Sequence, residues 1–327
     1  MNEIELGKSG LRAPQLGFGC AALLGRSGRT ESLRALNAAW DEGIRFFDTA
    51  RSYGYGESEA LVGEFLRGRR EQAIIATKFG ILPAPQAKWK QAAKVVVRHA
   101  LAVAPWARGI VRKGIAGQFT PNAFTVAVLQ QSIDDSLRKL GTDYVDFLLM
   151  HSAPASVLEQ QDLLEALGRL VEAGKVRVAG LSSEPHVVEL ALQRQTRHLS
   201  AMQFPCNVFD LSVAAKIAQH SNDAVLVANH PFGGVARVRE CAEILRGLSQ
   251  KPELDATLRE KLASKDETLL GDVVLNSILR DTGIHVVIPA MMRVEHIRAN
   301  VRALTNSRFN SQEIAQIRQA LIASSAS

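Results

Sequence analysis

Cysteine is scarce in this sequence. The 327 residues include only Cys20, Cys206 and Cys241, which lie far apart and form no Cys-x-x-Cys pair. Without paired or clustered thiols, neither a disulfide framework nor a metal site is expected, and the protein is expected to work in a reducing compartment.

Long apolar runs are also missing. None approaches the roughly 20 residues that a helix needs to span a bilayer. The N-terminal MNEIELGKSG has early acids and no apolar centre, so it does not resemble a signal peptide. Apolar residues nevertheless make up 46% of the chain, which is enough for a large core. These features predict a soluble, cytoplasmic protein with no membrane span.

A third absence is local. No Asp or Glu occurs between Gln72 and Ile133, although eight Lys or Arg do, and the whole chain has a net charge of +6. This stretch would attract phosphates, an anionic substrate or a membrane surface, or it is a solvated basic loop whose acidic partners lie elsewhere. Aromatic residues are only 6% of the chain, and so few rings argue against nucleic-acid binding.

What the sequence does contain is a repeated alternation of short β-branched runs and helical patterns. Eight strand–helix units of similar size predict one (β/α)8 barrel domain over residues 1–327, an α/β fold. IELGKSGLRAPQL predicts an N-terminal hairpin that plugs the barrel, and SQEIAQIRQALIAS an extra C-terminal helix. Two connections are long: a basic insert over 79–122 after the third strand and a loop over 230–266 after the seventh. The expected strands are 15–20, 44–48, 73–78, 144–151, 176–182, 200–204, 224–229 and 285–289.

The stretch GFGCAA, residues 17–22, matches the dinucleotide-binding pattern G-x-G-x-x-A. In that motif a helix follows directly, and its first amides hold a pyrophosphate. Here the helical pattern starts only near Thr30. We therefore interpret the match as small residues at a tight strand end.

Four ionisable side chains end successive strands or follow them. Asp48 ends the second strand, Tyr53 lies in the loop after it, Lys78 ends the third strand and His151 the fourth. Each has a plain alternative: a turn cap for Asp48, a rim aromatic for Tyr53, an exposed strand terminus for Lys78 and a core histidine for His151. In a barrel, however, catalytic groups come from the C-terminal ends of several strands, which favours a shared site.

These four groups suit acid catalysis. A phenol, with a pKa near ~10, is a poor proton donor at neutral pH unless its anion is stabilised. A neighbouring ammonium provides this stabilisation, a carboxylate holds the ammonium, and an imidazole can orient a substrate oxygen. No nucleophile or metal cage accompanies them, so we expect proton transfer coupled to chemistry that a cofactor supplies.

The segments FFDTARSYGYGESE, IIATKFG, GTDYVDFLLMH, RVAGLSS and VVIPAMMRVEHIRAN, in this order, resemble the aldo-keto reductase superfamily over essentially the whole chain. The resemblance implies a (β/α)8 barrel that binds NADPH, or NADH, without a Rossmann fold and transfers hydride to an aldehyde or ketone. It also implies that Tyr53 is the general acid, that Lys78 and Asp48 tune it, and that His151 orients the carbonyl.

The cofactor positions that the resemblance implies depart from the family's usual pattern at three places. Ser183 stands where the family more often has Asn, a small departure that keeps hydrogen-bonding ability. Where the family usually has a stacking tyrosine, this chain has Asn229, and Met291 and Met292 replace a small residue and a serine. The next residue, Arg293, suits a 2′-phosphate and favours NADPH over NADH. The implied cofactor residues are Ser182, Ser183, Gln203, Asn229, His230, Arg293, His296 and Asn300.

The leading hypothesis is an NAD(P)H-dependent reductase with a small-molecule carbonyl substrate. Alternatives are an aldose or alcohol dehydrogenase that works in the oxidative direction, and a weakly active regulatory barrel that binds cofactor. The insert 79–122 is expected to line the substrate pocket with Trp89 or Trp106, to order over bound cofactor, or to dock a partner.

Overall fold

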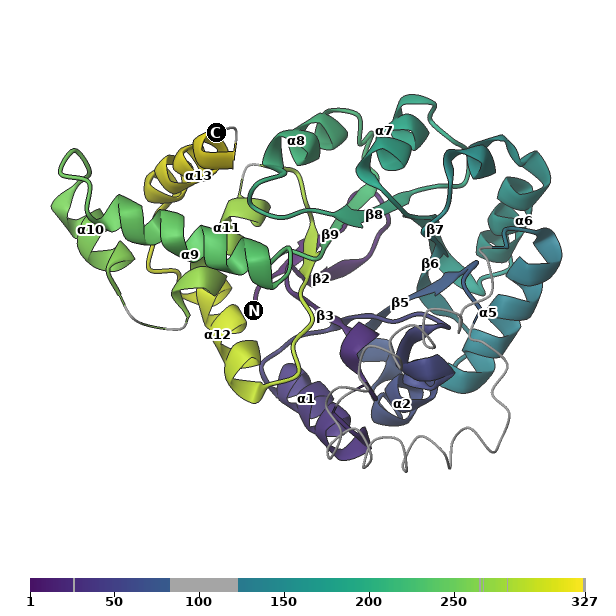
Figure 1. The fold of residues 1–327 in the computed structure, drawn as a ribbon. Coiled ribbons are helices and arrows are strands. Elements are labelled where there is room, and N and C mark those ends of the chain that lie inside the picture. Colours follow the sequence, from purple (N-terminus) through teal and green to yellow (C-terminus); the bar gives the residue numbers. More distant parts are fainter. Residues whose placement is uncertain (26, 83–122, 265, 267, 281, 326–327) are drawn as a thin grey trace, which may run out of the picture.

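Eight parallel strands form a nearly closed barrel surrounded by helices in the computed structural model, which describes residues 1–25, 27–82, 123–264, 266, 268–280 and 282–325 (Figure 1). The order runs without interruption from β3 to β10. A parallel bridge between Leu16 and Val287 and the hydrogen bond from Gly19 N to Pro289 O, 3.0 Å, join the first strand to the last. The predicted (β/α)8 fold is thus confirmed. The strands are β3 (Gly17–Gly19), β4 (Phe46–Asp48), β5 (Ile74–Phe79), β6 (Val145–His151), β7 (Val176–Ser182), β8 (Ala201–Pro205), β9 (Val225–Asn229) and β10 (Val286–Ile288).

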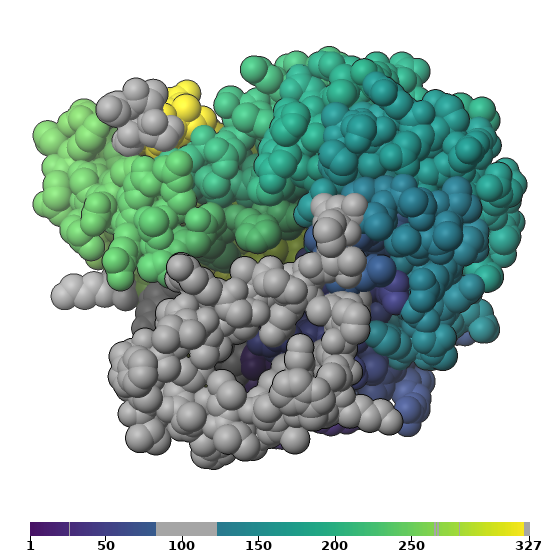
Figure 2. Space-filling model, turned by 45° about the vertical axis from the view of Figure 1, so that its right-hand side comes forward, coloured from purple at the N-terminus to yellow at the C-terminus, as the bar shows by residue number. Residues whose placement is uncertain are grey.

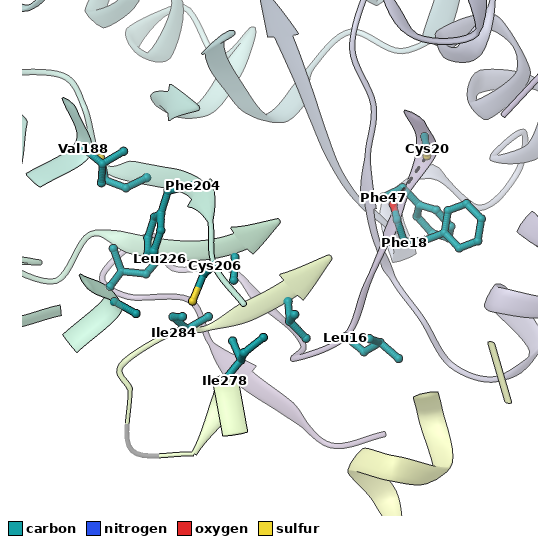
Figure 3. Packing of buried hydrophobic residues seen from close by; sticks show 14 of the residues in the cluster. Leu16, Phe18, Cys20, Phe47, Val188, Phe204, Cys206, Leu226, Ile278 and Ile284 are labelled. Carbon is teal, nitrogen blue, oxygen red and sulfur yellow. Dashed lines mark hydrogen bonds between the residues drawn. The ribbon is translucent and has the colours of Figure 1, made fainter. Parts of the chain in front are cut away.

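Alternation along the strands divides the apolar residues into two layers, because successive side chains point to opposite faces of a sheet. Phe46 and Phe147 belong to the smaller cluster, and their ring centroids lie 5.5 Å apart. Their neighbours Phe47 and Leu148 belong to the larger cluster with residues of the helices. Figure 3 shows part of this larger cluster, in which Phe47 lies next to Phe18. Near-continuous apolar strands therefore reflect a sheet that is buried on both faces.

An antiparallel hairpin of β1 (Glu3–Glu5) and β2 (Arg12–Pro14) precedes the barrel. Leu6 and Ala13 from this hairpin are fully buried and join the smaller cluster with the barrel strands. The hairpin therefore fills one end of the barrel interior, as its sequence predicts.

Helices cover the outside of the sheet, and α13 is the extra C-terminal helix that the sequence predicts. Within the part of the chain that the structure describes, no helix is long and apolar enough to cross a membrane. The longer helices are α1 (Arg29–Asp41), α2 (Ser58–Phe65), α5 (Val126–Leu140), α6 (Gln161–Glu172), α7 (Pro185–Gln193), α8 (Leu211–Gln219), α9 (Val235–Ser249), α10 (Ala256–Leu262), α11 (Leu269–Leu279), α12 (Val294–Thr305) and α13 (Ser311–Ser325).

The prediction of a long loop over 230–266 was wrong, because α9 and α10 occupy most of it. Cys241, Leu245 and Leu248 are buried at helical spacing, and they pack one side of α9 on the core. In the space-filling view the green segment that includes these helices forms one flank of the molecule (Figure 2). Of the predicted insert 79–122, residues 83–122, with Trp89 and Trp106, lie outside the described residues.

Candidate active site

Lys78 is the centre of a buried cluster at the C-terminal ends of the strands. Its Nζ lies 2.7 Å from both carboxylate oxygens of Asp48, 3.0 Å from Thr49 O and 3.3 Å from the Tyr53 hydroxyl. The side chains of Lys78 and Asp48 are 1% and 6% exposed, so water does not screen the ion pair as it does at a surface. Asp48 and Lys78, which the sequence placed at the ends of two strands, and Tyr53 from the loop between those strands thus form one connected group.

The loop that carries Tyr53 is tied to α5. Arg51 donates to Asp135 Oδ2 and to Ser132 Oγ at 2.5 and 2.8 Å, and Lys139 Nζ donates to Gly56 O at 2.7 Å. The backbone after Tyr53 has positive φ at Gly54, Tyr55 and Gly56, a conformation that costs energy at Tyr55 and that the surroundings must hold. Tyr53 therefore stands on a braced, tightly turned loop.

Electrostatics keep Lys78 charged. Burial lowers the pKa of its ammonium, but the carboxylate of Asp48 and the oxygen of Tyr53 raise it, and the net pKa is above the ordinary value. Burial is the largest influence on Tyr53 and raises its pKa, and the opposing effect of Lys78 is smaller. As expected, the ammonium of Lys78 by itself lowers the pKa of the phenol, but burial raises that pKa by more in the protein without cofactor.

His151 ends β6, and its ring meets that of Tyr53 edge to face at a centroid distance of 5.7 Å. Burial and the charge of Lys78 lower the pKa of the imidazole to about 3, so the ring is neutral at physiological pH. Its Nδ1 is buried and has no hydrogen-bond partner among the described residues. A buried polar atom without a partner is costly, which is typical of a group that meets a ligand.

The side chains implied for the nicotinamide carboxamide surround the same cluster. Ser182 Oγ donates to Gln203 Oε1 at 2.7 Å, and Gln203 Nε2 donates to Asp48 Oδ1 at 2.9 Å. Ser183 Oγ donates to Ala153 O at 2.5 Å. All three are buried, and each keeps unused donor or acceptor capacity, so the set fits an amide ligand.

A cavity of about 280 Å³ lies beside α11 and the start of α12. His296, Asn300 and Met291 line it together with Phe232. Phe232 was not among the predicted cofactor residues, although an aromatic residue followed by two glycines is a signal in the sequence. Asn300 is buried and its amide nitrogen lies 3.0 Å from Met291 Sδ. A mainly apolar cavity with an aromatic ring and a buried amide suits a planar base.

Three other predicted cofactor residues, Asn229, His230 and Arg293, do not line this cavity. Arg293 is exposed at the start of α12 and lines a neighbouring groove with Glu31, Arg34 and Glu42. His230 is exposed with a positive φ, and its Nδ1 lies 2.9 Å from Asn229 Oδ1. Neither Asn229 nor His230 touches the Lys78 cluster through any hydrogen bond that the described residues form.

Cys20 is a further residue near the cluster that the motifs did not indicate. It is fully buried at the end of β3, where burial and the charge of Asp48 raise the pKa of its thiol. Figure 3 shows it directed back toward Phe18, whose carbonyl oxygen lies 3.7 Å from Sγ. It follows Gly19, the last residue of the first strand, which pairs with Asp48 in the register, and this position is the signal that could have identified it.

A (β/α)8 barrel whose ionisable residues meet at the C-terminal strand ends has the architecture of an enzyme. The chain belongs to the aldo-keto reductase family, whose profile, described as Aldo/keto reductase family, matches residues 15–322. It is therefore an oxidoreductase that acts on carbonyls, in a family that uses nicotinamide cofactors.

Relatives of this family align with most of the chain. It is 28% identical to L-glyceraldehyde 3-phosphate reductase of Escherichia coli (strain K12), over 96% of this chain and 90% of that protein. It is 24% identical to the aldo-keto reductase yakc of Schizosaccharomyces pombe, whose name specifies NADP(+), over 94% and 88%. The holo structure of aldo-keto reductase AKR11C1 from Bacillus halodurans has a TM-score of 0.71 at 23% identity and covers 98% of this chain and 96% of that one, which shows the fold.

Proposed function

We propose that the protein is a carbonyl reductase that prefers NADPH and uses Tyr53 as its general acid. The observation that carries the proposal is the contact chain from Asp48 through Lys78 Nζ to the Tyr53 hydroxyl, with the edge of the His151 ring beside it. An ammonium 3.3 Å from a phenol oxygen stabilises the phenolate that remains after proton transfer.

Reduced nicotinamide, when bound, supplies a hydride to the carbonyl carbon of an aldehyde or ketone. Tyr53 gives its proton to the carbonyl oxygen as the alcohol forms, and Lys78 compensates the charge left on the phenol oxygen. Asp48 keeps the ammonium in place. Because His151 is neutral, it can orient the carbonyl oxygen by a hydrogen bond without competing as the proton donor.

The cofactor assignment rests on groups at three places in the chain's own structure. Ser182, Ser183 and Gln203 would hold the carboxamide next to Asp48, and the cavity lined by Phe232 and His296 would take the adenine. Arg293 would pair with a 2′-phosphate, and the NADP(+) named for the yeast relative supports this preference. The Asn229–His230 pair, in place of a stacking tyrosine, favours a second candidate, a regulatory barrel with slow turnover.

Oxidation of NADPH followed at 340 nm, with pure protein and a panel of reactive aromatic aldehydes such as 4-nitrobenzaldehyde, separates the two candidates. We expect turnover that requires both aldehyde and cofactor. Cofactor binding without oxidation across the panel would support the regulatory barrel and contradict the reductase.

Replacing Tyr53 by Phe removes the proton donor and leaves the shape of the site. We expect the turnover rate to fall by about 10²- to 10⁴-fold, the usual range for general acid catalysis, while the dissociation constant for NADPH changes little. Fluorescence titration of the cofactor with both proteins checks the second part. A Tyr53→Phe variant with near wild-type turnover would show that another group donates the proton.

A further inference from the structure

Gln203 makes a hydrogen bond that crosses the mouth of the barrel. It lies on β8, whereas its partner Asp48 lies on β4, and these strands are separated by three others in either direction around the eight-stranded ring. The two residues are 155 positions apart in the sequence. Of the hydrogen bonds that the described residues give Asp48, this is the one that ties its carboxylate to the opposite wall.

The orientation of the Gln203 amide follows from its two partners. An ionised carboxylate can only accept, so the NH₂ group must face Asp48 Oδ1, and the carbonyl must then accept from Ser182 Oγ. The side chain of Gln203 is buried at 1% exposure. Ser182 and Asp48 therefore hold this amide in one pose.

The Gln203 bond acts on the same carboxylate oxygen that Lys78 contacts. Asp48 Oδ1 accepts from Lys78 Nζ at 2.7 Å and from Gln203 Nε2 at 2.9 Å, and Oδ2 accepts from Lys78 alone among the described contacts. A donor from the far wall fixes the rotation of the carboxylate and takes up part of its charge. A carboxylate with a fixed rotation and a partly compensated charge keeps the Lys78 ammonium directed toward Tyr53.

We propose that Gln203 is a positioning residue for the proton donor, in that its bond to Asp48 fixes the Asp48–Lys78 pair against Tyr53 independently of any contact with cofactor. The inference rests on the proposed function for the role of Tyr53. Loss of the Gln203 amide leaves Asp48 with more uncompensated charge and a freer carboxylate. Each of these changes makes ionisation of Tyr53 harder, because the charge of Asp48 opposes it and Lys78 supports it.

The cofactor-free protein provides the first test. Tyrosinate absorbance at 295 nm reports ionisation, and subtraction of the matching Tyr53→Phe protein isolates Tyr53 from Tyr55 and Tyr144, the other tyrosines of the chain. In Gln203→Met we expect the Tyr53 midpoint to rise by about half a pH unit or more, or the Tyr53 signal to vanish from the pH range in which wild type shows it. An unchanged midpoint would overturn the proposal.

Ser183→Ala is the matched control for this titration. Its hydroxyl lies at the end of the neighbouring strand but donates to Ala153 O, outside the Gln203–Asp48 bond, so the Tyr53 midpoint should stay at the wild-type value. An equal shift in this variant would show that any disturbance of the strand ends has the effect, and the proposal would fall. If circular dichroism shows that Gln203→Met does not fold, Ser182→Ala takes its place, because it frees the amide to rotate and should give a smaller shift in the same direction.

Single-turnover kinetics with the holoenzyme give the second test. At saturating NADPH we expect Gln203→Met to reduce the rate of substrate reduction by about tenfold and to displace its pH profile, since a positioning role persists when cofactor is bound. A residue that only held the carboxamide would weaken NADPH binding and leave the saturated rate and profile unchanged, which would overturn the proposal. Wild-type protein without turnover would refute the proposed function instead, and the titration of the free protein would still decide the role of Gln203.

Discussion

At the scale of single residues, the site is governed by competition between burial and charge pairing. Lys78 is nearly inaccessible, yet its pKa is raised because Asp48 and Tyr53 together outweigh the cost of burial. Burial and charge also compete at Tyr53, but there burial is the stronger influence. Because burial disfavours the phenolate, the pKa of Tyr53 is raised. His151 has no compensating anion among the causes of its shift, and burial drives its pKa down. Beside the carboxylate of Asp48, the site thus holds a cationic Lys78, a neutral Tyr53 and a neutral His151 near neutral pH.

The low pKa of His151 predicts a pH dependence of stability. In the folded protein the ring is neutral down to about pH 3, whereas in the unfolded chain it takes up a proton below a pKa of about 6.5. The unfolded state therefore binds more protons as pH falls through this window, and stability is lost from about pH 6.5 downward. Urea unfolding at pH 8 and pH 5 should show that wild type loses about 1–2 kcal/mol more than His151→Gln. Tyr53→Phe, at the same site, should keep the wild-type loss, and equal losses in wild type and His151→Gln would contradict the pKa shift.

Arg293 is the residue on which we expect the cofactor preference to depend. Its guanidinium is exposed at the start of α12, where it can form paired hydrogen bonds with a 2′-phosphate that NADH lacks. Arg293→Ala should weaken NADPH binding by about 10- to 100-fold and leave NADH binding nearly unchanged. Arg302→Ala, on the exposed side of the last turn of the same helix, should alter neither value. Equal losses for both cofactors in Arg293→Ala would show that the 2′-phosphate is bound elsewhere.

At the scale of elements, the strands could be predicted because each is a short apolar run between polar turns, and the ends of those runs placed Asp48, Lys78 and His151. The helices α9 and α10 were not predicted, because long polar stretches separate the few apolar residues that they bury. The helical spacing of apolar residues is therefore weak over 230–266. The contacts of Arg51 with Asp135 and of Gln203 with Asp48 leave no local pattern at all. They depend on which strands and helices become neighbours or face each other in the closed ring.

Two helical glycines test how tightly the elements pack. A methyl group on Gly63 in α2 would lie 2.5 Å from the backbone of Leu140 at the end of α5, whereas one on Gly247 in α9 would meet nothing within 4 Å. Gly63→Ala should therefore destabilise the protein by about 1–3 kcal/mol, despite its better helix propensity. Gly247→Ala should stabilise it by about 0.5–1 kcal/mol. Chemical denaturation measures both, and a destabilising Gly247→Ala would contradict the helical assignment of α9.

At the scale of the whole molecule, closure of the barrel converts separate strand ends into one site. The bond between Gly19 and Pro289 and the bridge between Leu16 and Val287 join residues from the two ends of the chain. The same closure places β4 and β8 on opposite walls, and it brings the loop after β9 near the start of α12, where Phe232 and His296 line one cavity. Ligand binding across this mouth should therefore stabilise the barrel as a unit.

Thermal unfolding with added cofactor measures this coupling. A ligand that binds only the folded protein stabilises it by about 2.7 kcal/mol at a concentration one hundred times its dissociation constant. At equal concentrations we expect NADPH to raise the unfolding temperature by several degrees and NADH to raise it less, because only NADPH presents a 2′-phosphate to Arg293. The difference between the cofactors should disappear in Arg293→Ala and persist in Arg302→Ala. A larger shift with NADH would reverse the proposed preference, and no shift with either cofactor would show that the cavity lined by Phe232 and His296 is not a dinucleotide site.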